Sequence, residues 1–348
     1  MNSVESPADF SQVPVIDAAP LVAGLPERAE VARQIHEACR ASGFFYIVGH
    51  GVDPDLILRL ERLSRDFFDK SATEKLSIQM SKGGRAWRGY FAVGDELTSG
   101  RPDQKEGLYF GSELPDDHPD VVAGTPMHGR NLFPEIPGFR EAALEYIAAM
   151  TRLGHAMAAG LSLGLGLHER YLHDRYTADP LVLFRIFNYP RPSAPPEDAD
   201  APWGVGEHTD YGLLTILWQD EAGGLQIKSR RRWIEAPPIP GAFLCNIGDM
   251  LDRLTRGAYR STPHRVRNRS TRDRLSFAFF FDPNFHAEIH PIEGLSDKPV
   301  EDDRDERWDK ASVHEPTGTY GQYLLRKVAK VFPQLRGELG GAVDAERA

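Results

Sequence analysis

The sequence has few cysteines, no long apolar run and no excess of basic residues, and each shortage excludes a class of protein. Cys39 and Cys245 are too few for a disulfide framework, so we expect two buried thiols in a reducing compartment. No stretch reaches the roughly 18 apolar residues of a membrane span, and the N-terminus lacks the basic start and apolar run of a signal peptide. The net charge of −10 argues against nucleic acid and anionic membranes as partners. We therefore expect a soluble, cytoplasmic protein.

The sequence does contain helical patterns at both ends and a strand-rich region between them. Apolar residues recur at helical spacing in three segments of the N-terminal half and in one near the C-terminus, namely 26–41, 54–70, 138–164 and 318–331. We expect Lys327 and Lys330 on the solvent-exposed, or wet, face of the last helix. Short strands are predicted at 13–17 and 44–48, and 80–135 is expected to be rich in loops.

Between Leu181 and Phe285 the chain becomes a succession of short β-type runs separated by turns. The runs are 183–187, 213–218, 225–228, 233–236, 242–247 and 275–281. Evenly spaced short strands are typical of a sandwich or jelly roll. We interpret 191–202 as a loop, and 1–12 and 337–348 as tails.

A histidine and an aspartate two residues apart, His208 and Asp210, stand at the entrance to an apolar strand. Side chains two apart on a strand point to the same face, so this pair can bind one ion. A second histidine, His264, opens another β-type run. Two histidines and one carboxylate form the facial triad that suits non-haem Fe(II), because three adjacent positions stay open. The other His-x-Asp pattern, which begins at His118, contains a proline and is interpreted as an exposed turn.

Arg274 and Ser276 follow in the next β-type run, where alternation places both on one face. A guanidinium binds a carboxylate through two parallel charge-assisted hydrogen bonds, and a serine hydroxyl adds a third. The pair suits the distal carboxylate of a dicarboxylate cosubstrate whose keto acid end chelates the metal.

Each of these residues also has a structural explanation. Taken alone, His264 is better explained as a core histidine bonded to the backbone, and Asp210 could be a cap or turn residue. Arg274 lies in an arginine-rich stretch, most of whose members are expected to be solvated. The structural explanations require three independent coincidences in one order along the chain, so we favour the metal site.

Together these motifs resemble the isopenicillin-N-synthase-like branch of the Fe(II)/2-oxoglutarate oxygenases, along nearly the whole chain. The matching stretches are 13–17, 43–51, 188–190, 208–210, 223–226, 246–249, 264–266 and 274–276. The resemblance implies a mainly β protein with flanking helices and a double-stranded β-helix (jelly roll) core. It also implies Fe(II), O₂ and 2-oxoglutarate, with ascorbate as a further reductant. The expected regions are an N-terminal non-haem dioxygenase region at 12–125, linking helices at 126–178, the jelly-roll domain at 179–285, and a C-terminal extension and helix at 286–336.

Within that branch the chain is similar to the bacterial ethylene/succinate-forming enzyme and, more strongly, to plant homoarginine 6-hydroxylases. The shared stretches are 89–91, 96–103, 208–214 and 281–285, with 104–107 and 246–255 on the plant side. The similarity implies that Glu96 and Thr98 face a guanidinium group of the substrate. Tyr211 is a further candidate for a substrate contact, although an aromatic residue beside the start of a strand usually serves packing. Lys330 falls where the ethylene-forming relative has an arginine for the amino-acid carboxylate. Arg185 and Tyr189 would lie beside the cosubstrate.

The resemblance implies hydroxylation of a small molecule, an amino acid such as arginine or homoarginine, coupled to decarboxylation of 2-oxoglutarate to succinate and CO₂. An alternative is ethylene and succinate formation from 2-oxoglutarate. Another is an iron oxidase that uses no 2-oxoglutarate, against which Arg274 and Ser276 argue. A third is a non-catalytic binding protein with a structural metal, against which the open triad and the low cysteine content argue.

Overall fold

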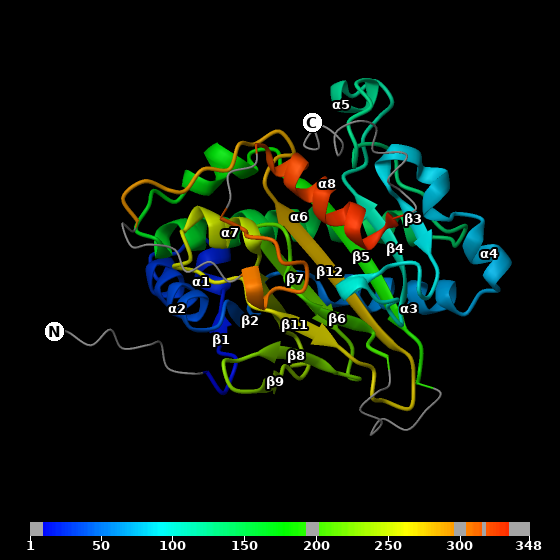
Figure 1. Ribbon diagram of the computed structural model, residues 1–348, viewed down its shortest axis with the longest axis horizontal. Coiled ribbons are helices and arrows are strands. Elements are labelled where there is room, and N and C mark those ends of the chain that lie inside the picture. Colours follow the sequence, from blue (N-terminus) through cyan, green and yellow to red (C-terminus); the bar gives the residue numbers. More distant parts are fainter. Residues whose placement is uncertain (1–9, 193–201, 296–303, 315–317, 334–348) are drawn as a thin grey trace.

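Two β-sheets form the centre of the protein in a computed structural model that describes residues 10–192, 202–295, 304–314 and 318–333 (Figure 1). The strand order of the larger sheet is β1–β2–β10–β7–β12–β5–β4–β3. These strands are β1 (Val15–Asp17), β2 (Phe44–Val48), β3 (Gly89–Phe91), β4 (Glu106–Gly111), β5 (Leu181–Tyr189), β7 (Leu214–Gln219), β10 (Phe243–Ile247) and β12 (Arg274–Asp282). The smaller sheet has the order β6–β11–β8–β9, formed by β6 (Val205–His208), β8 (Leu225–Lys228), β9 (Trp233–Glu235) and β11 (His264–Val266). The expected tails at 1–12 and 337–348 and the loop at 191–202 lie largely outside the described residues.

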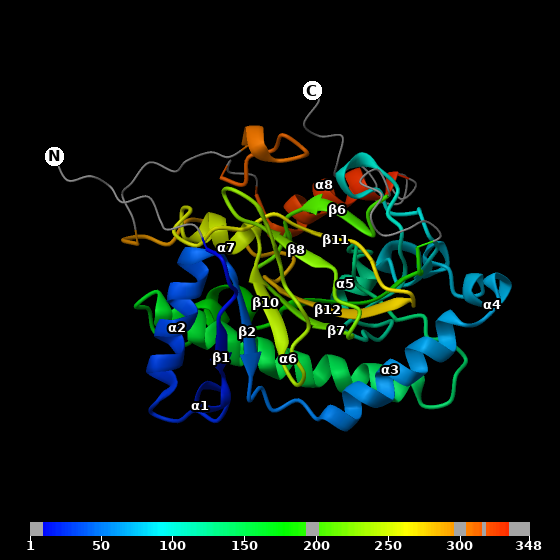
Figure 2. The same ribbon diagram turned by 90° about the horizontal axis from the view of Figure 1, so that it is seen from below.

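Helices α3 (Pro54–Phe68) and α6 (Phe139–Gly164) cover the large sheet on the face away from the small sheet (Figure 2). Figure 2 shows α3 and α6 along one side of the large sheet, with β6, β8 and β11 on the other side. Gly154 allows α6 to approach β12 closely, because a Cβ atom there would lie 2.4 Å from the ring of Phe281. Tyr146 of α6 packs on Phe184 of β5 with ring centroids 4.9 Å apart. The helices are α1 (Ala19–Val22), α2 (Arg28–Ala41), α3 (Pro54–Phe68), α4 (Ala72–Leu76), α5 (Pro119–Val122), α6 (Phe139–Gly164), α7 (Asp249–Leu254) and α8 (Tyr320–Val331). Among the described residues, no helix combines the length and the apolar character that crossing a membrane requires.

Strand β12 supports the functional site from the middle of the large sheet. It pairs antiparallel with β5 and β7, so that Arg274 lies opposite Tyr189 and Ser276 lies opposite Phe187. Its odd-numbered aromatic residues face α6, as the contact of Phe277 with Tyr146 shows. Its even-numbered residues therefore face the space between the sheets.

The segment 80–135 is rich in loops, as expected, and it also contains two strands, β3 and β4, that were not predicted. Glycine is depleted in strands, and Gly107 and Gly111 interrupt the apolar pattern of β4. The strand forms because it pairs with β5, with Tyr109 opposite Arg185. A Cβ at Gly107 would lie 2.5 Å from the Phe91 ring, so the glycine permits close packing against β3. Tertiary pairing rather than local pattern decides these strands.

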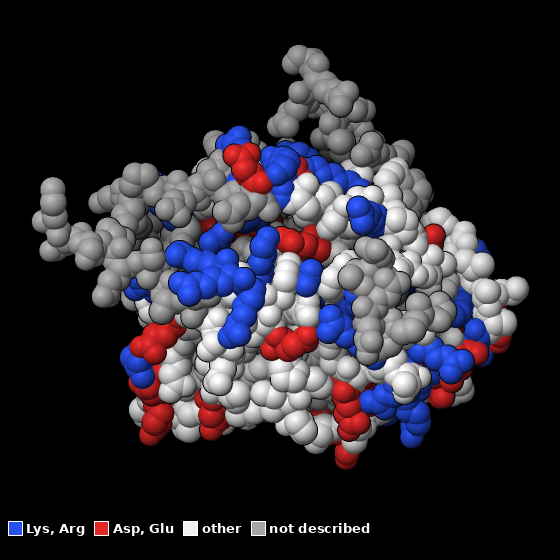
Figure 3. Space-filling model, turned by 60° about the horizontal axis from the view of Figure 1, so that its bottom comes forward, with Lys and Arg blue, Asp and Glu red and all other residues white. Residues whose placement is uncertain are grey.

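Figure 3 shows one face of the protein with charged side chains of both signs. Lys and Arg side chains form a band across this face, and Asp and Glu side chains lie beside and below it.

Candidate metal centre

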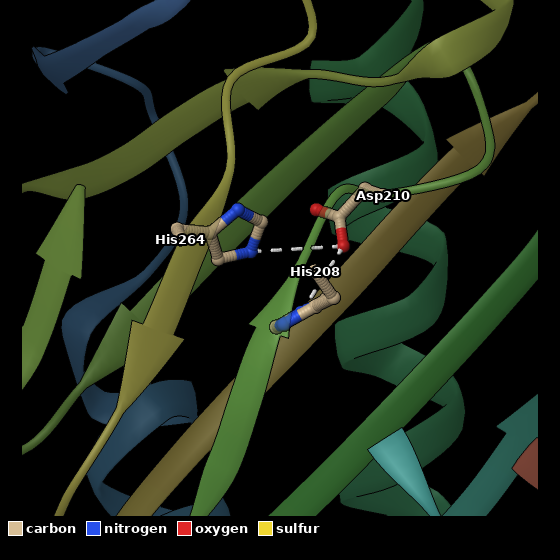
Figure 4. Close-up of side chains that lie close together, drawn as sticks. All are labelled: His208, Asp210 and His264. Atoms are coloured by element: carbon tan, nitrogen blue, oxygen red, sulfur yellow. Dashed lines mark ion pairs between the residues drawn. The ribbon is translucent and has the colours of Figure 1, made fainter. Parts of the chain in front are cut away.

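Three side chains from two parts of the chain converge between the two sheets (Figure 4). His208 is the last residue of β6 and His264 the first residue of β11, and the two are cross-strand partners. Asp210 lies just beyond β6, and its Oδ1 atom is 3.9 Å from Nε2 of His208 and 3.8 Å from Nε2 of His264. One ligand atom from each residue lies within 4.8 Å of the others. One metal ion can therefore contact all three.

The convergence of His208 and Asp210 has a different cause from the one that the sequence suggested. We expected both residues on one strand, where alternation would align them. In the structure β6 ends at His208, and Asp210 lies in the loop before β7. The turn of this loop, rather than the strand period, brings the carboxylate toward the imidazoles.

Hydrogen bonds to surrounding groups orient the metal-binding atoms of the three side chains. Nδ1 of His208 lies 2.8 Å from the carbonyl of Gly206, and Nδ1 of His264 lies 3.2 Å from the carbonyl of Thr262. Because a carbonyl only accepts, each Nδ1 carries the proton and each Nε2 keeps its lone pair for a metal.

The carboxylate of Asp210 is held in the same manner. Its Oδ2 atom accepts hydrogen bonds from Oγ1 of Thr215 at 2.5 Å and from Nδ2 of Asn246 at 2.7 Å. Its Oδ1 atom faces the two imidazoles. Sequence reasoning did not select Thr215, and it quoted Asn246 only as part of a family stretch.

The environment favours the protonation states that a metal requires. Burial lowers the pKa of both His208 and His264, so the imidazoles are neutral at pH 7. Burial raises the pKa of Asp210, but His264 and His208, where protonated, and the hydrogen bonds from Asn246 and Thr215 outweigh it and hold the pKa below the ordinary value. Two neutral imidazoles and one carboxylate, with the remaining sides open to a cavity, fit a facial triad for Fe(II).

Arg274 presents an unused donor to the same cavity. Its side chain is fully buried, at 0% exposure. Nε donates to the carbonyl of Gly223 at 2.5 Å, and Nη2 donates to Oε1 of Gln219 at 3.0 Å. The buried Nη1 atom has no hydrogen-bond partner among the described residues. A buried donor without a partner is costly, and a carboxylate is the partner that a guanidinium binds best.

The metal-binding group and Arg274 line one cavity. The space open to the centres of water molecules is about 90 Å³, compared with roughly 10–15 Å³ for one water. Of the residues predicted to contact cosubstrate or substrate, those that line it are Glu96, Thr98, Arg185, Tyr189, Tyr211, Arg274 and Ser276.

A buried charge network forms another part of the cavity lining. Oε2 of Glu96 lies 2.7 Å from Nζ of Lys105 and accepts a hydrogen bond from the Tyr109 hydroxyl at 2.9 Å. Lys105 also pairs with Asp103, whose Oδ2 accepts from the hydroxyl of Thr98 at 2.6 Å. Burial raises the pKa of Glu96, but Lys105 and Arg185 lower it, so the carboxylate is ionised. Lys105 was not predicted as a site residue, although it lies in the stretch 104–107 that carried the plant resemblance.

Arg185 is held in an aromatic sandwich on the Glu96 side of the cavity. Its guanidinium carbon lies 4.2 Å from the ring centre of Tyr109 and 4.9 Å from that of Phe280. Nη1 is 3.9 Å from Oε1 of Glu96. Its place beside the cosubstrate remains a prediction.

Two sequence interpretations of the last helix need correction. Lys330 does not line the cavity, and its Nζ atom lies 3.1 Å from Oδ2 of Asp309. Lys327, expected on the wet face, is 4% exposed and lies 2.7 Å from the same oxygen. Asp309, which lies outside the helix, therefore pairs with both amines; Lys327 is held in the interior, whereas the Lys330 side chain stays 39% exposed, as expected for the solvent-facing side of the helix. The pattern that begins at His118 starts a short helix rather than an exposed turn: the half-buried His118 is the N-cap of α5, and its side chain accepts a hydrogen bond from the backbone of Asp120.

Comparisons with known proteins agree with this geometry. A family model described as the N-terminal region of the non-haem dioxygenase in morphine synthesis matches residues 13–136, and the model of the 2OG-Fe(II) oxygenase superfamily matches residues 181–283.

Curated relatives match most of the chain. A probable iron/ascorbate oxidoreductase of Dictyostelium discoideum is 52% identical, covering 89% of this chain and 91% of its own. A 1-aminocyclopropane-1-carboxylate oxidase of Dictyostelium mucoroides is 38% identical, covering 93% and 96%. A homoarginine-6-hydroxylase of Oryza sativa subsp. japonica is 35% identical, covering 93% and 99%.

A solved structure confirms the expected jelly-roll architecture. A full-length Neurospora crassa protein, crystallised with α-ketoglutarate and thymine, is 27% identical with a TM-score of 0.76, covering 91% of this chain and 96% of its own. Iron and 2-oxoglutarate are therefore the cofactors of this fold, as expected. The chain belongs to the 2OG-Fe(II) oxygenase superfamily.

Proposed function

We propose that the protein hydroxylates a guanidino amino acid, arginine or homoarginine, with 2-oxoglutarate as cosubstrate. His208, Asp210 and His264 would hold the iron. Bound iron, with 2-oxoglutarate and O₂, supplies the oxidising power that hydroxylates a C–H bond and leaves succinate and CO₂. The main support for this proposal is that the triad and the buried carboxylate of Glu96 line one cavity.

Arg274 and Ser276 are proposed to bind the distal carboxylate of 2-oxoglutarate. The unpartnered Nη1 of Arg274 supplies one charge-assisted hydrogen bond, and the Ser276 hydroxyl two residues along the strand supplies another. Because Gly223 and Gln219 hold the other guanidinium nitrogens, the donor is positioned before the cosubstrate arrives.

Glu96 is proposed to bind the guanidinium group of the substrate. Lys105 and Tyr109 occupy its Oε2 atom, whereas Oε1 has only the 3.9 Å contact with Arg185 among the described residues. Oε1 can therefore accept from a planar cation in the cavity. The 35% identity to a homoarginine-6-hydroxylase supports this substrate class.

A succinate-release screen over amino acids tests the proposal. Protein purified without oxygen and reconstituted with Fe(II) should release succinate with arginine or homoarginine, and the hydroxylated product should appear in proportion. Glu96→Gln should raise the KM for the guanidino substrate on the order of 10-fold or more, since a charge-assisted contact is lost. Asp116→Asn, which changes an exposed carboxylate, should match the wild type. Equal succinate release with every amino acid, or an unchanged KM in Glu96→Gln, would contradict the substrate assignment.

The relative named 1-aminocyclopropane-1-carboxylate oxidase supports a second candidate, oxidation of a small amino acid to ethylene. Headspace ethylene, measured with 1-aminocyclopropane-1-carboxylate and with 2-oxoglutarate alone, separates this activity from hydroxylation. Full oxygen uptake without 2-oxoglutarate would favour the oxidase and would leave the donor of Arg274 without a role.

A further inference from the structure

A segment far from the metal ligands in sequence is bonded to the loop that carries two of them. We call residues 304–314 the strap. It precedes α8 and lies next to α7 and α8, in orange in Figure 2. His314 at its end lies 3.3 Å from Oδ1 of Asp252 in α7, and Asp309 in its middle pairs with Lys327 of α8. The strap is thus fastened to both helices.

Arg307 extends from the strap to the metal-binding loop. Its side chain is 4% exposed. Nη1 donates to Oγ1 of Thr209 at 3.0 Å and to Oδ1 of Asp249 at 2.9 Å. Thr209 stands between His208 and Asp210, so the guanidinium is bonded to the residue that joins two proposed metal ligands.

Asp249 makes the second link to the loop. Its backbone N–H donates to the carbonyl of Asp210 at 2.8 Å, and its Oδ2 accepts from the hydroxyl of Tyr323 at 2.7 Å. The next residue, Met250, donates its N–H to the carbonyl of Gly212 at 3.0 Å. The start of α7 therefore holds the backbone of the loop, while Arg307 joins the side chains of Thr209 and Asp249 into a closed ring of contacts.

Charge balance shows that this ring depends on Arg307. Asp249 is fully buried, and an ionised carboxylate without a partner is not tolerated there. Lys327 is 3.9 Å from Asp249 and closer to Asp309, so Arg307 is the main partner.

We propose that Arg307 is a positioning residue that sets the orientation of His208 and Asp210 through Thr209 and Asp249, so that the strap controls metal affinity. The inference rests on the proposed metal roles of those two residues and goes beyond them, because neither family model extends to the strap. Partners of metal ligands that are one step removed typically change metal affinity by about 10- to 100-fold when they are replaced.

Co(II) binding to the full-length protein tests the inference without relying on turnover. Arg307→Lys keeps a positive charge but cannot reach both oxygens from one planar group, and Thr209→Val removes one acceptor and keeps the side-chain shape. We expect each to weaken Co(II) binding on the order of 10-fold. The double variant Arg307→Lys/Thr209→Val should lose less Co(II) binding free energy than the sum of the two single variants, because either change alone already disturbs the contact. Lys310→Met, an exposed change within the same strap, should bind Co(II) like the wild type.

A purely structural role would give a different result. In that case the thermal unfolding midpoint of the metal-free protein would fall, while Co(II) affinity measured well below the transition would equal that of the wild type, and the inference would be overturned. Thr209→Val keeps the test decisive if an Arg307 variant does not fold. His208→Ala in the same titration separates the two hypotheses: unchanged Co(II) binding would contradict the proposed metal site itself. Loss of binding in His208→Ala with normal binding in the Arg307 and Thr209 variants would overturn the inference alone.

Discussion

Replacing Arg274 with lysine tests the cosubstrate site most directly. In the structure Nε of the guanidinium donates to Gly223 and Nη2 donates to Gln219, whereas Nη1 is buried without a partner among the described residues. A lysine ammonium keeps the charge but is a single donor atom and cannot replace all three nitrogens. The loss of one hydrogen bond to a charged group costs about 1.5–3 kcal/mol. At about 1.4 kcal/mol for each tenfold change, we expect the Kd of 2-oxoglutarate to rise about 10- to 100-fold.

Calorimetric titration of 2-oxoglutarate into the Co(II)-loaded variant measures this Kd without oxygen or turnover. The KM for 2-oxoglutarate in succinate release should rise in parallel, and the KM for the prime substrate should change little. Arg272→Lys is the matched control, because the Arg272 side chain is about half exposed and its ion pair with Glu221, at 3.4 Å, lies on the surface. A folded Arg274→Lys protein that binds 2-oxoglutarate as tightly as the wild type would refute the reasoning.

Three further predictions concern stability and the metal loop. Burial lowers the pKa of His264 from its ordinary 6.5 to about 4. The metal-free protein should therefore lose stability as the pH falls between these values. In His264→Gln the unfolding midpoint should depend less on pH over this range. Burial raises the pKa of Asp282 from 3.8 to about 7, so the stability that this group contributes is lost as the pH rises between these values. The stability of Asp282→Asn relative to the wild type should therefore be greater at about pH 8 than at about pH 5. An equal difference in stability at the two pH values would contradict the assignment. A Cβ at Gly248 would lie 2.4 Å from the carbonyl of Gly212 and 3.0 Å from that of Asp210, so Gly248→Ala should cost about 1–3 kcal/mol in denaturant unfolding and weaken Co(II) binding. Normal Co(II) affinity in that variant would show that the loop yields without moving its carboxylate.

Parts of the site could be predicted because they depend on residue type and local spacing. The metal ligands were predicted from the order of His208, Asp210 and His264 in the sequence, and the structure brings their ligand atoms within 4.8 Å of one another. Arg274 and Ser276 follow strand alternation, and both line the cavity as that period requires.

Other parts could not be predicted because only the packed fold brings the partners together in the interior. Nothing local distinguishes Lys327 from a solvated helical lysine, and only the fold brings Asp309 to within 2.7 Å of it. Lys105 is buried because Glu96 and Asp103 supply opposite charges at one point. These partners lie within ten residues of Lys105, but the stretch resembles an ordinary polar loop and does not indicate that the fold buries it.

By itself the sequence determined which atoms can bind metal and dicarboxylate, and which segments become helices and central strands, because donor chemistry and apolar periodicity are properties of short stretches. The tertiary structure decided where each donor points. The loop after β6 turns Asp210 toward the imidazoles, Thr215 and Asn246 hold its outer oxygen, and Arg307 reaches the loop from about a hundred residues away in the chain. Orientation depends on contacts between segments, and such contacts exist only after the sheets and helices have packed.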